Sequence, residues 1–206
     1  MAEKAVTEPD AIAVDAVDAH ADDTLIRGLR EAAPAACSEL CQRFGPRLHR
    51  FAAARLGWDG QLAEDIAIQA LADAIRNIRQ FNPRKSTLSA WLYGVLRRQI
   101  IRELRRRGRQ KWAPAEARVP FDHLDETTLE ADPAGRLDAQ LDARRQVTEV
   151  AAILTNIEFE VLVLSAVDEL SAREIGQVVG RSERAIHSLL HRARTKARER
   201  LVRDED

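Results

Sequence analysis

The amino-acid sequence predicts an all-α protein made of two small helical domains, and three observations support this prediction. Of the 206 residues, 45% are apolar and 32% are charged, but only 4% are aromatic. Sheets favour aromatic and β-branched residues, whereas Ala, Leu, Arg and Glu, which dominate here, are strong helix formers. Apolar residues recur at helical spacing in two parts of the chain, which a proline-punctuated stretch separates.

These patterns divide the chain into four segments. Residues 1–21 are rich in Ala and Asp without a sustained period, so we expect a disordered acidic tail. Residues 22–107 form the first predicted domain and residues 137–203 the second. Residues 108–136 contain three prolines and many acids, which indicates a flexible acidic linker. Two small domains on such a tether are expected to move independently.

The first domain is expected to contain four helices. A short helix begins near Asp23 or Thr24, and a second follows Leu40 to Phe51, with an interruption expected at Gly45-Pro46. The turn at residues 57–60 separates it from a third helix, and the loop at residues 81–87 precedes a fourth. Ser86 or Thr87 is expected to cap that fourth helix. Its Trp91 lies in register with the apolar stripe, which favours core packing over stacking on a base.

The second domain ends in a predicted helix-turn-helix. Ser171 is followed three residues later by Glu174, which is the pattern of a capping box. Gly180 suits the left-handed end of the first helix, and Ser182 can cap the second. The inner side of this second helix is apolar, and its outward positions are polar: Glu183, Arg184, His187, Ser188, His191, Arg192 and Arg194.

Charge is concentrated in blocks, although the net charge is only −1. Residues 84–111 carry ten basic residues and one acid, and residues 172–200 carry eight basic residues and three acids. Two such blocks predict two polyanion-binding surfaces. A solvated helix face is expected to carry acids beside its basic residues, whereas these blocks carry few acids. A helix fits the major groove, so Arg184 and His187 near its start are predicted to read bases. Arg192, Arg194 and Lys196 lie further along and are predicted to hold phosphates.

The segment LSAREIGQVVGRSERAIHSLLHRAR resembles the promoter-reading C-terminal domain of bacterial RNA polymerase sigma factors. The residues that match the family pattern are Leu170, Ser171, Glu174, Ile175, Gly180, Ser182, Ser188, Leu190, Arg192 and Ala193. The first domain resembles the other sigma domain through residues 63–75 and through residues 81–107, where Phe81, Pro83, Ala90, Trp91, Leu92 and Arg97 fit. The order of the parts is similar to the compact extracytoplasmic-function (ECF) group of the sigma-70 family.

The resemblance implies a sigma factor with a sigma-2-like helical bundle and a sigma-4-like helix-turn-helix. Such a protein directs core RNA polymerase to promoters and assists DNA opening. The implied partners are the clamp of the largest polymerase subunit, the flap of the second-largest subunit, promoter DNA and an anti-sigma factor. The residues that the resemblance and the charge pattern assign to the minus-thirty-five element are Ser182, Arg184, His187, Ser188, Arg192, Arg194 and Lys196. Those assigned to the minus-ten element are Asn82, Arg84, Lys85, Ser86, Arg97, Arg98, Arg102 and Arg105.

Polymerase docking is assigned to Asp65, Ile68, Gln69 and Leu71. The family pattern there is near D-L-V-Q-E-T-F, so Ile68 and Gln69 stand where Gln and Glu are usual. Because Gln69 can accept a hydrogen bond but cannot form an ion pair, docking is the step most altered in this chain. A sigma-like decoy or adaptor that binds an anti-sigma protein without programming polymerase is therefore an alternative hypothesis.

Other function classes have less support in the sequence. A dimeric helix-turn-helix repressor would not need the second basic domain. An enzyme is not expected, because no phosphate loop, metal-ligand cluster or catalytic triad pattern is present, and no cofactor or metal is predicted. Cys37 and Cys41 are interpreted as small core residues rather than as half of a zinc site. With neither a signal peptide nor a membrane span expected, the predicted location is the cytoplasm.

Overall fold

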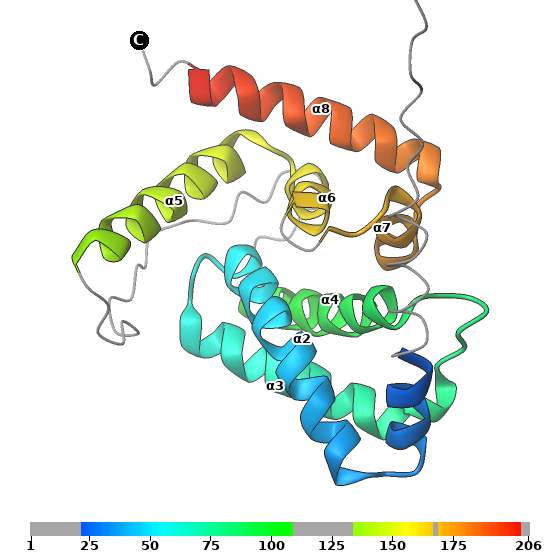
Figure 1. Cartoon of the computed structure of the whole chain (residues 1–206). Helices are drawn as coiled ribbons and strands as arrows, with labels where there is room; N and C mark the ends of the chain where they lie inside the picture. The colour runs from blue at the N-terminus through cyan, green and yellow to red at the C-terminus, as the bar shows by residue number, and fades with distance from the viewer. Residues whose placement is uncertain (1–21, 109–133, 167–168, 203–206) are drawn as a thin grey trace, which may run out of the picture.

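The structure is a computed structural model that describes residues 22–108, 134–166 and 169–202. Every regular element in these ranges is helical, which confirms the all-α prediction (Figure 1). The predicted acidic tail at residues 1–21 and residues 109–133 of the predicted linker lie outside the described residues. Helix α5 (Ala134–Ile153) begins inside the predicted linker range.

The first half of the chain is a bundle of helices around one apolar core. A helix at residues 22–30 is followed by α2 (Pro34–Arg55), α3 (Gly60–Asn77), the 3₁₀ turn η1 (Ile78–Gln80) and α4 (Leu88–Arg107). The expected apolar stripe of α2 is buried, because Leu40, Phe44, Leu48 and Phe51 are each no more than 1% exposed. Figure 1 shows α2 crossing α3 and α4.

Helix α2 runs without a break through Pro46, so the interruption expected at Gly45-Pro46 is wrong. Proline inside a helix removes one hydrogen bond to the carbonyl four residues earlier. Pro46 is exposed, and so is Gln42, whose carbonyl loses its partner. Water can therefore satisfy that carbonyl, and the buried side of the helix stays intact.

Side-chain caps begin the next two helices of the bundle. Asp59 Oδ1 accepts a hydrogen bond from the Leu62 N–H (3.0 Å), which ends the turn predicted at residues 57–60. Thr87 Oγ1 accepts from the Ala90 N–H (3.2 Å) and caps α4, so Thr87 rather than Ser86 fills the predicted role. The loop at residues 81–87 is thereby fixed at the start of the most basic helix.

The second half contains α5, α6 (Asn156–Ala166), α7 (Ala172–Val179) and α8 (Glu183–Val202). The capping box predicted at the start of α7 is present: the Ser171 side chain accepts from the Glu174 N–H, and the Glu174 carboxylate accepts from the Ser171 N–H. Gly180 ends α7 in the left-handed conformation, with φ 73° and ψ 42°. Helices α7 and α8 are therefore the predicted helix-turn-helix.

Substitution of Gly180 by Ala is expected to lower the free energy of unfolding by about 1–2 kcal/mol, because a side chain is strained in the left-handed region. A Cβ at Gly180 would meet no atom within 4 Å, so a steric clash cannot cause the loss. Gly94→Ala, within α4, is the matched control. There a Cβ would lie 3.7 Å from the Arg98 side chain, which is an ordinary contact. Inside a helix, Ala is also more stabilising than Gly. Urea denaturation of both variants tests the prediction, which fails if Gly180→Ala is no more destabilising than Gly94→Ala.

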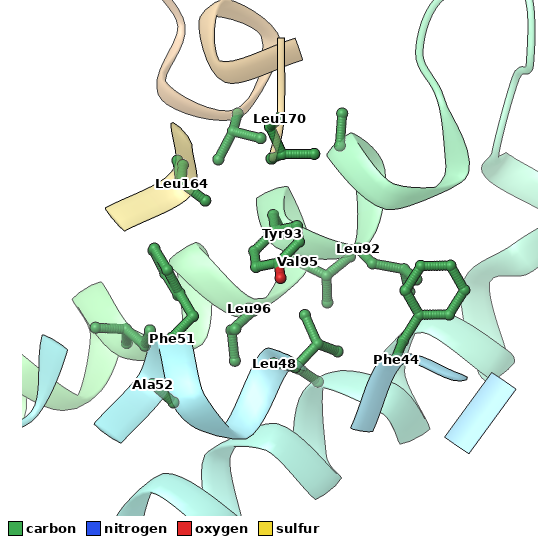
Figure 2. Close-up of a cluster of buried hydrophobic side chains, with 14 of the residues drawn as sticks. Phe44, Leu48, Phe51, Ala52, Leu92, Tyr93, Val95, Leu96, Leu164 and Leu170 are labelled. Carbon is green, nitrogen blue, oxygen red and sulfur yellow. The ribbon is translucent and has the colours of Figure 1, made fainter. Parts of the chain in front are cut away.

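The two halves pack against each other, which differs from the expectation of independent domains. Figure 2 shows Phe51 of α2 and Tyr93 of α4 beside Leu164 of α6 and Leu170. The first three of these side chains are 0% exposed and so are completely buried. The ring of Phe51 lies 5.4 Å from that of Tyr93 in an edge-to-face arrangement. The apolar core is therefore shared between the halves, since burying these side chains removes a large apolar area from water.

Candidate DNA-binding and polymerase-binding surfaces

Helix α8 presents a polar face to solvent and an apolar face to the protein. Ile186, Leu189, Leu190 and Ala193 are buried, as predicted. Ser182 caps the helix by accepting a hydrogen bond from the Ala185 N–H (3.3 Å). The side chains predicted to point outward are all exposed: Glu183, Arg184, His187, Ser188, His191, Arg192 and Arg194.

The two residues predicted to read bases lie on the first turns of α8. Arg184 is exposed, and its backbone carbonyl accepts a hydrogen bond from Ser188 Oγ (3.1 Å). The His187 side chain is 67% exposed, with Nε2 3.9 Å from Glu183 Oε1. Ser188 uses its hydroxyl within the helix, so Arg184 and His187 are the better placed of the three to meet a base edge.

The three residues predicted to hold phosphates instead contact α6. Lys196 Nζ lies 2.8 Å from Glu158 Oε2, and Arg192 Nε lies 3.5 Å from Glu158 Oε1. Arg194 donates a hydrogen bond to Ser165 Oγ (3.1 Å). Arg192 and Lys196 remain 60% and 42% exposed, so their charges still contribute to the surface. In this structure Arg192, Arg194 and Lys196 hold α8 against α6.

Glu158 of α6 accepts two of these three contacts, those from Arg192 and Lys196. Burial acts to raise the pKa of its carboxyl, but hydrogen bonds from Lys196 and Thr155 outweigh burial, and the pKa is lowered. The Thr155 N–H and hydroxyl donate to Glu158 Oε2 at 3.0 and 2.9 Å. A carboxyl with a lowered folded-state pKa contributes stability that is present above its unfolded pKa.

Glu158→Gln is therefore expected to lower the melting temperature at neutral pH and to have less effect in acid. The stability that Glu158 contributes disappears as the pH falls through the lowered pKa, because the native carboxyl then becomes protonated as well. Melting curves of both proteins between neutral and acidic pH test this. Parallel pH profiles would contradict the assigned role of the carboxylate.

The loop before α4 holds the first group of minus-ten candidates. Asn82, Arg84 and Lys85 are exposed, and Ser86 is partly exposed. Asn82 Oδ1 accepts from the Arg84 N–H (3.0 Å), and the Asn82 carbonyl accepts from the Lys85 N–H (3.0 Å). These bonds form a tight turn and leave the Arg84 and Lys85 side chains in solvent.

The basic residues of α4 form the second group, and they differ in their partners. Arg98 and Arg105 are exposed and have no hydrogen-bond or ion-pair partner within the described part of the chain. Arg102 donates to Gln99 Oε1 (2.9 Å). Arg97 Nε, by contrast, lies 2.8 Å from Glu160 Oε1 of α6, which belongs to the other half.

The end of α4 is better paired than its sequence indicated. Glu103 Oε1 accepts from Arg106 (2.7 Å) and from Arg107 (2.8 Å), and Arg107 also reaches Asp59 (3.2 Å). The hydrogen bond from Arg106 is the main cause that lowers the pKa of Glu103 to about 2. The lone acid of this block therefore neutralises much of the charge of Arg106 and Arg107. The uncompensated charge lies at Arg98, Arg102 and Arg105.

The predicted docking residues lie on α3, but they do not share one face. Asp65 and Gln69 are exposed, and Ile68 is 58% exposed. Gln69 Nε2 donates to Asp73 Oδ1 (3.2 Å). Leu71 is only 6% exposed, so we assign it to the core rather than to a contact surface.

Several residues with clear electrostatic roles were not singled out from the sequence. Glu158 and Glu160 are 4% and 3% exposed on the largely apolar α6, and Arg55 is 7% exposed at the end of α2. Burial lowers the pKa of Arg55, while Glu160 acts to raise it. Acids within an apolar run need buried partners, which is the signal that could have identified them.

The remaining predictions concern side chains outside these surfaces. The Trp91 ring lies 5.3 Å from the Phe81 ring and packs against the core, which supports the core-packing interpretation.

Cys37 is partly buried, but Cys41 is exposed, so its prediction as a core residue is wrong. Leu40 covers the core on that turn of α2, and Cys41 lies about 100° further round the helix, beside the buried stripe. The described residues contain no group of three or more His, Cys, Asp or Glu side chains that could hold a metal ion. Within the same ranges, no helix has both the length and the apolar character to cross a membrane.

Comparison with protein families identifies both halves. The family described as Sigma-70 region 2 matches residues 40–110, and Sigma-70 region 4 matches residues 144–196. The curated ECF RNA polymerase sigma factor SigD of Mycobacterium tuberculosis is 26% identical over 170 residues, which cover 81% of this chain and 77% of the relative. The SigD protein of Mycobacterium bovis matches to the same extent.

Solved structures show the same fold. The structure of CnrH in complex with the cytosolic domain of CnrY superposes with a TM-score of 0.66 at 23% identity, covering 89% of this chain and 99% of CnrH. The sigma factor RpoE, solved in complex with the anti-sigma factor NepR from Bartonella quintana, gives a TM-score of 0.58 at 20% identity and covers 80% of this chain and 95% of its own. With a region 2 bundle followed by a region 4 helix-turn-helix, the chain belongs to the ECF RNA polymerase sigma factors of the sigma-70 family and acts as a sigma factor rather than as an enzyme.

Proposed function

We propose that this sigma factor brings core RNA polymerase to promoters through two DNA-binding surfaces and two polymerase-binding surfaces. The exposed start of α8 reads the minus-thirty-five element, and Arg184 and His187 contact its bases. The loop at residues 82–86 and the exposed arginines of α4 bind the minus-ten element and hold its opened strand. The outer face of α3 docks on the clamp of the largest polymerase subunit, and the region 4 domain meets the flap of the second-largest subunit.

The observation that best supports polymerase docking is the exposure of Ile68. Its exposed fraction of 58% is the highest among the large apolar side chains of the described residues. The buried centre of a protein contact is more apolar than its rim, and Ile68 stands in the segment that resembles the docking pattern of sigma factors. Asp65, three residues earlier, lies on the same side of α3, and its carboxylate can orient the contact.

The division of the chain into an acidic tail, two domains and a linker remains part of this proposal. An anti-sigma partner is included, because the similar proteins CnrH and RpoE were solved with CnrY and with the anti-sigma factor NepR, respectively. The cytoplasm, where core polymerase acts, is the proposed location.

Ile68→Asp is expected to weaken binding to core RNA polymerase by at least about tenfold, since a charge at the centre of an apolar contact loses its solvation. Ile153→Asp is the matched control, because Ile153 is also a large exposed apolar residue (40%) but lies on α5. Binding is measured by fluorescence anisotropy of the labelled chain at moderate salt. Equal affinity of the two variants would refute docking through α3.

The restored variant with Ile68→Gln and Gln69→Glu separates the two hypotheses about function. A natural chain that binds core polymerase tightly establishes that the altered docking sequence works. Binding by the restored variant alone would favour the decoy or adaptor that recruits an anti-sigma protein and never programs polymerase.

A further inference from the structure

We propose that the free chain holds itself closed through a buried ion-pair latch that takes Arg97 away from DNA while leaving the recognition helix α8 exposed. The latch consists of Glu160 of α6, Arg97 of α4 and Arg55 of α2. The proposal rests on the proposed function in one respect, which is the assignment of Arg97 to the minus-ten surface.

The three latch residues come from both halves of the chain. Glu160 Oε1 lies 2.8 Å from Arg97 Nε, and Glu160 Oε2 lies 3.9 Å from Arg55 Nη2. Arg55 also donates to the backbone carbonyl of Asn156 at the start of α6 (3.3 Å). The side chains of Glu160 and Arg55 are 4% and 6% exposed, so solvent does little to screen their charges.

Burial makes this ion pair selective for one arrangement of the halves. A buried carboxylate without a cation is strongly disfavoured, so α6 is stable here only when the arginines of α2 and α4 face it. When the halves separate, Glu160 and Arg55 regain water and Arg97 is released. The latch is therefore a contact that either forms completely or is replaced by solvent.

Two further contacts close the same interface. Thr87 Oγ1, at the cap of α4, donates to Glu174 Oε1 (2.7 Å), while the other oxygen of that carboxylate completes the capping box of α7. The Arg144 guanidinium of α5 lies 5.7 Å from the centre of the Trp58 ring. Residue 87 adjoins the loop of minus-ten candidates, so region 4 contacts the chain at one end of that surface.

A closed chain cannot contact both promoter elements. Elements centred near minus ten and minus thirty-five lie about 25 base pairs apart, which is about 85 Å of DNA at 3.4 Å per base pair. The 25 residues between positions 108 and 134 could reach at most about 80–90 Å. A compact chain of about 200 residues is only about 45 Å across, so the halves must come apart before both elements are bound at once.

Closure affects the two DNA surfaces unequally. Arg184 and His187 remain exposed at the start of α8. Figure 1 shows α6 and α7 between α8 and the helices α2 and α4. Arg97 is paired and only 26% exposed. The closed chain therefore offers its minus-thirty-five surface and withholds part of its minus-ten surface until a partner opens the latch.

The test measures the separation of the halves in the full chain without polymerase or DNA. Cys37→Ala and Cys41→Ser remove the natural thiols, and spin labels are attached at Gln42→Cys on α2 and Glu199→Cys on α8, both exposed positions. Double electron–electron resonance should give one short distance between the two spin labels in the otherwise unaltered chain. Glu160→Gln should lower the ratio of closed to open chains by at least about tenfold, since the buried arginine is left without its carboxylate.

Glu103→Gln is the matched control, because it removes one negative charge and two ion pairs that lie within α4. It should leave the distance unchanged. Arg97→Met breaks the latch from the other side and should lengthen the distance as Glu160→Gln does. Circular dichroism verifies that each variant remains helical, and if Glu160→Gln fails to fold, Arg97→Met decides the outcome.

A second readout uses a labelled 30-nucleotide single strand of mixed sequence. Glu160→Gln should bind it about tenfold more tightly than Glu39→Gln does, because more of the chain is open while the net charges of the two variants are equal. Glu39 is exposed on α2 and has no ion pair among the described residues, so its removal frees no basic side chain of α4. Unchanged distances in both Glu160→Gln and Arg97→Met would overturn the latch whatever the DNA shows. Longer distances with equal DNA affinity would retain the latch and overturn the assignment of Arg97 to the minus-ten surface.

Discussion

Arg184→Ala is expected to lower the affinity of the holoenzyme for a promoter that it selects by about 10- to 100-fold, as expected for loss of a base-reading arginine. Arg184 is exposed near the start of α8 and has no side-chain partner within the described residues, so its removal leaves the fold intact. Because the contact is to a base, the loss should be largest on the preferred sequence. Discrimination at one minus-thirty-five position should then be relaxed.

Arg194→Gln separates reading of the sequence from binding of phosphate. Arg194 is exposed later on α8 and touches only the Ser165 hydroxyl among its described contacts. Its loss should weaken binding equally on all sequences. The slope of log affinity against log salt concentration should fall by about one, because one fewer ion is released on binding. Binding titrations of both variants over a range of salt and promoter sequences measure the difference. An Arg184→Ala variant that weakens all sequences equally would assign Arg184 to the DNA backbone.

Phe51→Ala is expected to lower the free energy of unfolding by about 3–5 kcal/mol, the usual cost of removing a buried aromatic ring. Phe51 is 0% exposed and packs edge-to-face on Tyr93. Figure 2 places Leu164 of the other half beside this pair. The cavity therefore opens in the shared core rather than within one domain.

Backbone hydrogen exchange shows how far the effect of Phe51→Ala extends. We expect faster exchange in α6 as well as in α2 and α4, because the halves share this core. Leu40→Ala provides the comparison, since Leu40 is also buried on α2 (1% exposed) but lies three turns earlier. Exchange that accelerates only in the first half for Phe51→Ala would contradict the shared core.

Local patterns in the sequence predicted the fold well wherever the deciding interactions were local. The capping box of Ser171 and Glu174 and the left-handed Gly180 depend on neighbours within a few residues, and both are present as predicted. The continuous α2 was missed, because the effect of Pro46 depends on whether its face meets water or the core. Cys41 was misplaced for the same reason.

The candidate surfaces were less predictable, because their electrostatics depend on distant partners. The sequence indicated that Arg97 and Lys196 were free cations, but acids of α6 lie against both. Those acids are 63 and 38 residues away along the chain, so no local spacing connects them. Leu71 could not be separated from Ile68 by motif alone, whereas burial places one in the core and the other in solvent. The packing of the two halves was missed for the same reason.

The most direct test of the central claim is transcription by core polymerase with and without this chain on fragmented genomic DNA of the organism that encodes it. Mapping the 5′ ends of the transcripts reveals where initiation occurs. We predict that the chain directs initiation to a small set of sites that share one sequence near minus thirty-five and another near minus ten, and that Ile68→Asp abolishes these starts. Starts that are the same with and without the chain would contradict its role as a promoter-selecting sigma factor.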